Sequence, residues 1–118
     1  MNFSSIDDFK QTVEQLITGS NTISKSALIS LIPAGVVNSW DSSWSNIQIG
    51  FKYHFDIDGT SVVIKWHSED PDAAAKYPGC NSGSMWTAQI RVGHRLLRYD
   101  TLAWVRASCN ETHIPLQQ

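Results

Sequence analysis

The chain has 118 residues, enough for one domain with a single hydrophobic core. Apolar residues make up 42% of it and charged residues 17%, which argues against an intrinsically disordered chain. The net charge of −2 does not point to bulk attraction to nucleic acid, and no apolar run approaches the roughly 18 residues of a membrane span.

Two amphipathic helices are predicted in the N-terminal part, residues 4–33. Ser5 is typical of an N-cap, and Asp7 and Asp8 follow it in the first turn, where acidic groups are favoured. The apolar residues that come next fall on one helical face: Phe9, Val13, Leu16 and Ile17. Gly19 is expected to end this helix.

A second, shorter helix is predicted to begin at Ser24 and to end at Pro33. Its expected core residues are Ala27, Leu28, Leu31 and Ile32. The segment 38–46 is rich in Ser, Asn and Asp, so we expect a loop, anchored by Trp40 and Trp44 as core or covering side chains.

A β-hairpin is predicted over residues 47–67, because Asp58-Gly59 suits a two-residue turn in which both positions need a positive φ. Pairing Ile57 with Thr60 sets the register. One face then holds apolar pairs: Phe55 opposite Val62, Tyr53 opposite Ile64, and Phe51 opposite Trp66. The other face holds Lys52 opposite Lys65, His54 opposite Val63, and His67 opposite Gly50.

The second face of this hairpin is cationic, and like charges directly opposed are destabilising. An anionic partner would offset them. This inference depends on the register, because a bulge before His67 would turn that side chain toward the core and leave the lysines as an ordinary solvated face.

A long irregular segment, 68–84, is predicted as a functional or mobile loop. A strand over 85–92 follows, with Trp86, Ala88, Ile90 and Val92 toward the core and with Thr87, Gln89 and Arg91 on the other face. Strand-like residues continue at 96–97 and 102–106, and residues 110–118 are expected to be a tail.

These elements predict a single α+β domain, 1–118, with two N-terminal helices packed on a twisted antiparallel sheet over about 47–107. Charge is unevenly spread along it. Residues 85–106 carry four arginines and one acid, a balance of +3, so a local basic patch is expected on a mildly acidic domain.

The polar sheet face offers groups for phosphodiester cleavage. Histidine exchanges protons near neutral pH, and lysine and arginine stabilise the added negative charge of a pentavalent phosphorane. No metal is required where the neighbouring 2′-hydroxyl of RNA attacks. No metal-site spacing is seen, a disulfide between Cys80 and Cys109 stays open, and His94 and His113 are expected at the surface.

Three segments resemble the bacterial polymorphic toxin type 30 domain: Tyr53–Gly59 (YHFDIDG), Trp66–Ala73 (WHSEDPDA) and Pro78–Arg91 (PGCNSGSMWTAQIR). In that family an Asp-Gly hairpin leads to a His-Gly-Pro-Asp-Pro-like motif, a Gly-Ser-Asn-Ser-like stretch and a Gly-Trp strand. Here Ser68-Glu69 stands in place of Gly-Pro, and Ser84-Met85 in place of the glycine before Trp86.

The resemblance implies a C-terminal toxin module of a larger secreted protein, neutralised by a cognate immunity protein. It implies ribonuclease activity and singles out His67 among the four histidines. Such a module is secreted or injected within its parent effector and acts in the cytoplasm of the target cell. A looser analogy links it to small RNase folds in which His and Lys line a concave sheet.

We therefore expect a metal-independent endoribonuclease toxin domain for interbacterial competition, with RNA as substrate, no cofactor and a monomeric active form. The expected catalytic residues are His67, His54, Lys65 and Arg91, with His54 as the counterpart of His67 in proton transfer. The expected substrate-binding residues are Lys52, Thr87, Gln89 and Ser84.

Two other hypotheses stay open. The chain would be a non-catalytic binding module, such as an immunity or adaptor protein, if its basic face serves only to meet an acidic partner. A nucleotide-using toxin such as an ADP-ribosyltransferase would need a nicotinamide pocket, and no sequence pattern indicates one.

Overall fold

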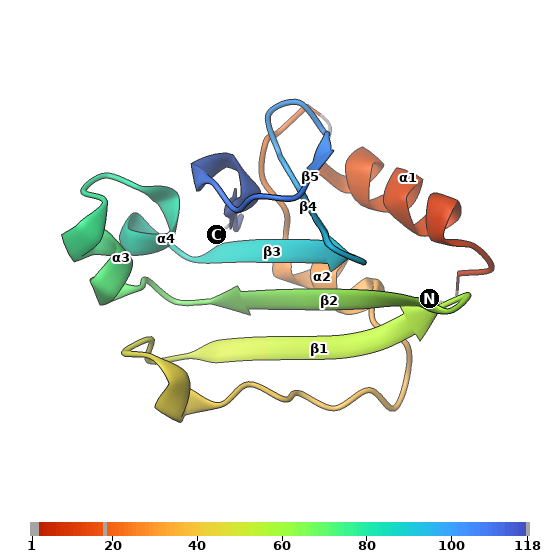
Figure 1. Cartoon of the computed structure of the whole chain (residues 1–118), viewed down its shortest axis with the longest axis horizontal. Helices are drawn as coiled ribbons and strands as arrows, with labels where there is room; N and C mark the ends of the chain where they lie inside the picture. Colours follow the sequence, from red (N-terminus) through yellow and green to blue (C-terminus); the bar gives the residue numbers. More distant parts are fainter. Residues whose placement is uncertain (1–2, 18, 118) are drawn as a thin grey trace.

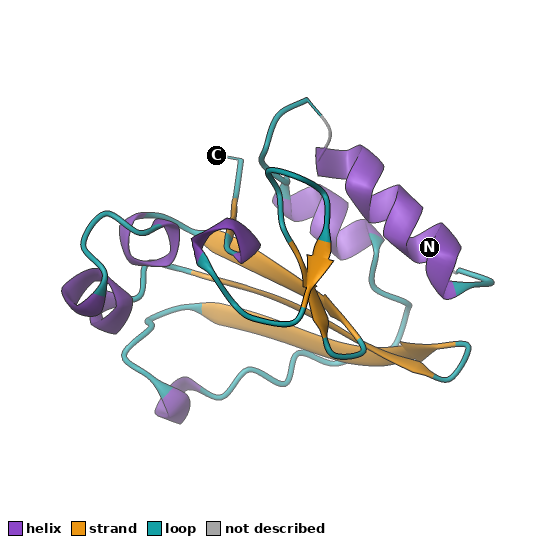
Figure 2. Ribbon diagram, turned by 45° about the horizontal axis from the view of Figure 1, so that its top comes forward, coloured by secondary structure: helices purple, strands orange, loops and turns teal. Residues whose placement is uncertain are grey.

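The computed structural model describes residues 3–17 and 19–117. It is a mixed α+β fold built on an antiparallel sheet, as predicted (Figures 1 and 2). The helical elements are α1 (Ile6–Ile17), α2 (Lys25–Ser30), η1 (Ser42–Trp44), α3 (Pro71–Lys76), α4 (Asn81–Ser84) and η2 (Asn110–Thr112). The strands are β1 (Gly50–Ile57), β2 (Thr60–His67), β3 (Thr87–Val92), β4 (Arg95–Leu97), β5 (Trp104–Val105) and β6 (Ile114–Pro115).

Side-chain caps start both N-terminal helices. The Ser5 hydroxyl accepts a hydrogen bond from the amide of Asp8 at 3.1 Å, and the Ser24 hydroxyl accepts one from the amide of Ala27 at 3.1 Å. Such caps satisfy amides that have no partner within the helix. The predicted helix starts are therefore confirmed.

The buried stripe of α1 is narrower than the sequence suggests. Phe9, Val13 and Ile17 are fully buried, but Leu16 is 37% exposed. Residues four apart form one row along a helix, and Leu16 lies about 60° from the centre of that row. The prediction that Leu16 belongs to the core is therefore wrong.

The hairpin forms as predicted. Asp58 and Gly59 have φ values of 49° and 79°, as a type I′ turn requires. Strands β1 and β2 pair in the predicted register, from Ile57 opposite Thr60 to Gly50 opposite His67. No bulge precedes His67, so its side chain lies on the same face as that of Lys65.

The sheet has the strand order β1-β2-β3-β4-β5, and β6 also pairs with β3. The predicted third strand and the direction of its side chains are confirmed over Thr87–Val92, because Gln89 pairs with Lys65 and Thr87 with His67. The strand was expected to begin at residue 85, but Met85 caps the end of α4 and Trp86 precedes the strand. Helices α3 and α4 lie at the end of the sheet where β2 ends and β3 begins (Figure 1).

The core joins the helices to the apolar face of the sheet. The ring of Phe9 in α1 contacts that of Phe55 in β1 edge to face at 6.2 Å, and Trp66 is stacked against Phe51 and Tyr53. Burying side chains of this size contributes about 1.5–3 kcal/mol each. The cluster's buried members on the two helices and β1–β3 are Phe9, Val13, Ile17, Leu28, Phe55, Ile57, Val62, Ile64, Trp66, Ala88, Ile90 and Val92.

The sequence prediction for the connection between β2 and β3 is wrong. The segment 68–84 is not irregular, because it forms α3 and α4. Asp70 caps α3 by accepting a hydrogen bond from the amide of Asp72, and Pro71 occupies the first turn, where its missing N–H costs nothing. Gly83 of α4 packs on the backbone of Ala74, so close that a Cβ would clash.

Residues 110–118 are not a tail over the part that the structure describes, which ends at 117. Ile114 in β6 is fully buried and pairs with Ala88. Leu116 forms a bridge with Ile23. The strand expected over 102–106 shrinks to β5, since Leu102 has a φ of 60° that no strand accepts.

None of the helices formed by residues 3–17 and 19–117 is long and apolar enough to cross a membrane.

Candidate functional site

Three strands bring the polar side chains into rows across one face of the sheet. Lys52, Lys65 and Gln89 lie side by side on β1, β2 and β3. The next row along the strands contains His67 beside Thr87. Because side chains alternate between faces, all five lie on the face opposite the core.

The short strand β6 adds His113 to this face. Ile114 pairs with Ala88 and Pro115 with Thr87, so continuing the same register by one residue sets His113 beside Gln89. His113 was expected at the surface and not among the site residues, so this placement is not foreseen from the sequence. A two-residue apolar period, Ile114 then Leu116, was the available signal for a pairing segment.

A cavity of about 270 Å³ opens over these rows. We call it the histidine cavity. It is lined by Trp40, Trp44, Ser45, Ile47, Lys52, Lys65, His67, Asp70, Ser82, Gln89 and His113. A smaller adjoining hollow shares Lys52, Lys65 and Gln89 with it and adds Val63, Arg91, Leu96 and Ser108.

His67 is buried and held in one orientation. Its Nδ1 lies 2.7 Å from the carbonyl oxygen of Ser68. Because a carbonyl only accepts, Nδ1 carries the proton in this contact and Nε2 is left as the basic nitrogen. Burial lowers the pKa of His67, the Ser68 carbonyl raises it, Lys65 lowers it and Asp70 raises it, with burial the strongest effect.

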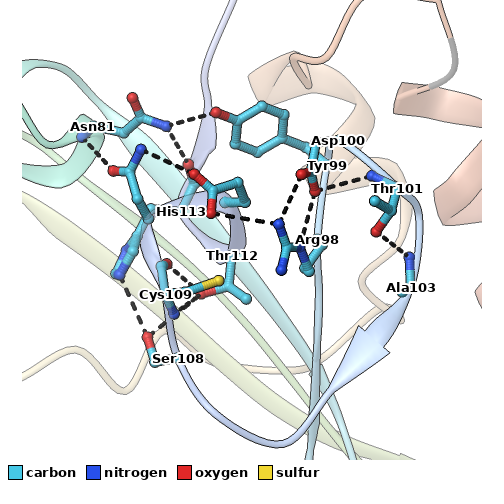
Figure 3. A network of polar contacts seen from close by, with 12 residues as sticks. Asn81, Arg98, Tyr99, Asp100, Thr101, Ala103, Ser108, Cys109, Thr112 and His113 are labelled. Atoms are coloured by element: carbon cyan, nitrogen blue, oxygen red, sulfur yellow. Dashed lines mark hydrogen bonds and ion pairs between the residues drawn. The ribbon is translucent and has the colours of Figure 1, made fainter.

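His113 is the second histidine of the cavity. Its Nε2 lies 3.5 Å from the Ser108 hydroxyl (Figure 3), and its buried Nδ1 has no hydrogen-bond partner in the described part of the chain. Burial lowers the pKa of His113, and the charges of His67 and Lys65 lower it further. The two rings therefore oppose being protonated together, which favours one acid and one base.

A polar network fixes the backbone that carries His113 (Figure 3). The Asn81 side-chain amide donates to the His113 carbonyl at 3.2 Å and to the Tyr99 hydroxyl at 3.1 Å. The backbone N–H of Asn81 donates a hydrogen bond to the Asn110 side-chain oxygen at 2.8 Å. The Thr112 hydroxyl donates one to the Cys109 carbonyl at 2.8 Å. Helix α4 and η2 thus position this histidine together.

The cations on this face have no carboxylate partner within 4.0 Å among the residues that the structure describes. Across residues 3–17 and 19–117, the ion pairs within 4.0 Å are those of Arg98 with Asp100 and Glu111. Burial lowers the pKa of the Lys65 ammonium, and the charges of Lys52 and Arg91 lower it further. An anion at this face would relieve that repulsion.

The other predicted site residues lie outside the histidine cavity or below its surface. His54 is exposed and its Nε2 lies 2.8 Å from the Ser61 hydroxyl. It pairs with Val63, four residues from His67 along β2, or about 13 Å. The structure therefore does not bring His54 and His67 together.

Thr87 and Ser84 were expected to bind substrate, but neither hydroxyl is presented to the cavity. Thr87 is only 1% exposed, and its hydroxyl has no hydrogen-bond partner among the described residues. The Ser84 hydroxyl donates to the Cys80 carbonyl at 2.7 Å, and Ser84 lines neither of the two hollows described above. Ser82, two residues earlier in α4, lines the histidine cavity in its place.

Cys80 and Cys109 are both free thiols and line one further cavity, together with Tyr77, Asn110 and His113. Over residues 3–17 and 19–117, no group of three or more His, Cys, Asp or Glu side chains gathers as a metal site would.

Comparisons with known proteins find no counterpart: no protein-family model, no curated protein and no solved structure matches the chain. The resemblance to the polymorphic toxins therefore stays a prediction.

Proposed function

We propose that the chain is an endoribonuclease toxin domain that cleaves RNA without a metal ion. One observation carries this proposal: the buried His67 and the half-buried His113, both with lowered pKa values, line one cavity together with cations that have no carboxylate partner among the described residues. Histidine pairs with such pKa values suit acid–base catalysis at mildly acidic pH, and cations without carboxylate partners suit a phosphate.

In the proposed reaction, Nε2 of His67 removes the proton from the 2′-hydroxyl of the substrate. The freed oxygen attacks the adjacent phosphorus, so that a new bond forms between O2′ and phosphorus. Protonated His113 donates its proton to the 5′-oxygen as the bond from phosphorus to that oxygen breaks. The products are a 2′,3′-cyclic phosphate and a 5′-hydroxyl, and proton transfers of this kind contribute about 10²–10⁴-fold to a rate.

The cations act on the phosphorane. Lys65 is the central one, since it lines both hollows and lies two residues before His67 on the same face of β2. Arg91 and Lys52 flank it, and the Gln89 amide, between Lys65 and His113, donates to a phosphate oxygen. In this assignment His113 takes the role that sequence analysis gave to His54.

A toxin module of this kind acts after delivery within a larger effector and is held in check by an immunity protein. Because the cations of this face have no carboxylate partner among the described residues, we expect the immunity protein to cover them with an acidic surface.

Purified protein incubated with total RNA in EDTA tests the activity. We expect cleavage of RNA that leaves 2′,3′-cyclic phosphate ends. DNA should not be cleaved, and an RNA with one 2′-deoxy nucleotide should not be cleaved at that nucleotide, because the attacking hydroxyl is missing. His67→Ala and His113→Ala each lower the rate at least about 100-fold. His94→Ala, at an exposed position outside the histidine cavity, is the matched control and keeps full activity.

The same series contains the outcomes that would overturn the proposal. Intact RNA, or cleavage only after metal is added, removes the mechanism. Loss of activity in His54→Ala with full activity in His113→Ala would return the second role to His54.

The basic face also supports a second candidate, a non-catalytic module that binds an acidic partner. Expression in a host without an immunity protein separates the two, because a toxin stops growth and a binding module is tolerated.

A further inference from the structure

An exposed indole lies at the rim of the histidine cavity. Trp44 is 57% exposed, and it lines the cavity together with His67, Lys52 and His113. An open indole face at the rim of a polar cavity is suited to contact a planar group of a ligand that enters the cavity.

The loop that carries this indole is tied to the edge of β1. The Asn38 side-chain oxygen accepts hydrogen bonds from the amides of Trp40 at 2.9 Å and Lys52 at 3.0 Å. The Ser39 amide donates to the Lys52 carbonyl at 2.8 Å. Asp41 caps the 3₁₀ turn η1, which contains Trp44, by accepting a hydrogen bond from the Ser43 amide. These bonds hold the loop in one place before any ligand arrives.

Trp40 completes the connection to the site. Its ring lies 5.7 Å from the ring of His67 and 6.5 Å from that of Trp44. The Lys52 ammonium lies 4.7 Å from the centre of the Trp44 ring. Trp40 therefore connects the exposed indole to the base of the proposed reaction, and the Lys52 cation lies against that indole.

We propose that Trp44 is the stacking platform for a nucleobase of single-stranded RNA, next to the phosphate that His67 and His113 act on. Stacking on an aromatic side chain needs an unpaired base and tolerates all four bases. Lys52 then contacts the phosphate of the same nucleotide. This inference rests on the proposed function and deepens it, because it names single-stranded RNA as the substrate class.

The test uses the full chain labelled with ¹⁵N at tryptophan and titrated with AMP, ribose 5-phosphate or inorganic phosphate. We expect AMP to shift the Trp44 indole signal, assigned through Trp44→Phe, and ribose 5-phosphate and phosphate, which reach the neighbouring Lys52 alone, to shift it much less. Trp44→Ala weakens AMP binding about 5- to 150-fold with unchanged affinity for ribose 5-phosphate, and Trp44→Phe restores most of it.

Tyr77→Ala is the matched control, since Tyr77 is equally exposed, at 60%, but lines the cavity of the two cysteines. Equal AMP affinity in Trp44→Ala and the unchanged protein would contradict the proposal that Trp44 stacks on a base. Loss of AMP affinity in Tyr77→Ala instead would place the base in the cavity of the two cysteines. A melting curve checks that each variant is folded.

The kinetics separate this inference from the proposed function. On single-stranded RNA, Trp44→Ala raises KM and leaves kcat in place, because stacking holds substrate and transition state alike. If Trp44→Ala cleaves RNA with an unchanged KM, the stacking proposal is wrong and the ribonuclease proposal stands. If AMP binds through Trp44 but the protein does not cleave RNA, the ribonuclease proposal is wrong and a nucleotide-binding site remains.

Discussion

At the scale of single residues, the two histidines of the cavity set the pH dependence of the proposed reaction. His67 must be neutral to take a proton and His113 must be charged to give one. Both pKa values lie below the ordinary value of about 6.5, His67 mainly through burial and His113 through burial and the neighbouring charges. Since kcat/KM for this scheme peaks between the two pKa values of the free enzyme, we expect a bell-shaped profile with its maximum below pH 6.5.

The measurement is kcat/KM against pH on a short RNA, with Lys65→Ala as a comparison. Lys65 lowers the pKa of both histidines, so its removal moves the maximum toward higher pH. A maximum above pH 7 in the unchanged protein would contradict the assignment of acid and base.

His67 and His113 also differ in how far the sequence predicts them. His67 follows from local rules, because the turn at Asp58-Gly59 sets the register of β2 down to its last residue. His113 depends on the pairing of β6 with β3, a contact between residues 26 apart in the chain. Propensity carries no information on such a pairing.

At the scale of elements, β1 and the loop before it are matched through Gly50. Trp40 packs flat on this glycine, so that an added Cβ would overlap the indole. Gly50→Ala should therefore displace Trp40 from His67 and lower the rate of RNA cleavage. In a Trp40→Ala background the same change should have little further effect, because the clash is gone.

The cycle of four proteins is measured by kcat/KM and by urea unfolding. Equal losses from Gly50→Ala with and without the Trp40 ring would show that the glycine matters for another reason.

Strand β6 is the second element to test, because it carries His113 to the site. Ile114 is fully buried, so Ile114→Ala should cost about 2–5 kcal/mol of unfolding free energy, with a lower urea midpoint and an unchanged m-value. Ile29→Ala, at a position that is 52% exposed, is the matched control and should change stability by less than about 0.5 kcal/mol. If Ile114→Ala also changed the unfolding free energy by less than about 0.5 kcal/mol, residues 110–117 would behave as the tail expected from the sequence.

The short elements mark the limit of sequence-based prediction here. The hairpin and the two N-terminal helices carry their own periodicity, caps and turn, so their positions are predictable. Helix α4 has four residues, and β6 has two. They are held by tertiary contacts, such as the packing of Gly83 on Ala74 and the hydrogen bond from Asn81 to the His113 carbonyl. Local sequence patterns do not predict which residues make such contacts.

At the scale of the whole molecule, charge is separated rather than balanced. The net charge is −2, yet Lys52, Lys65 and Arg91 share one face without a carboxylate within 4.0 Å among the described residues. A chain that is acidic overall can thus bind an anion through one face. Binding that depends on a few phosphate contacts releases a matching number of counterions from the RNA.

This charge separation predicts a definite salt dependence. With three phosphate contacts, the logarithm of the RNA affinity should fall with the logarithm of salt at a slope of about −2, or roughly 20-fold between 50 and 200 mM. Lys52→Ala should flatten the slope by about 0.7. Lys25→Ala should leave it unchanged, because the Lys25 ammonium lies over Phe51, whose side chain is on the opposite face of the sheet. Fluorescence anisotropy with a single-stranded 2′-O-methyl RNA, which lacks the nucleophile, measures affinity without cleavage. An equal slope for Lys52→Ala and the unchanged protein would mean that RNA meets another face of the molecule.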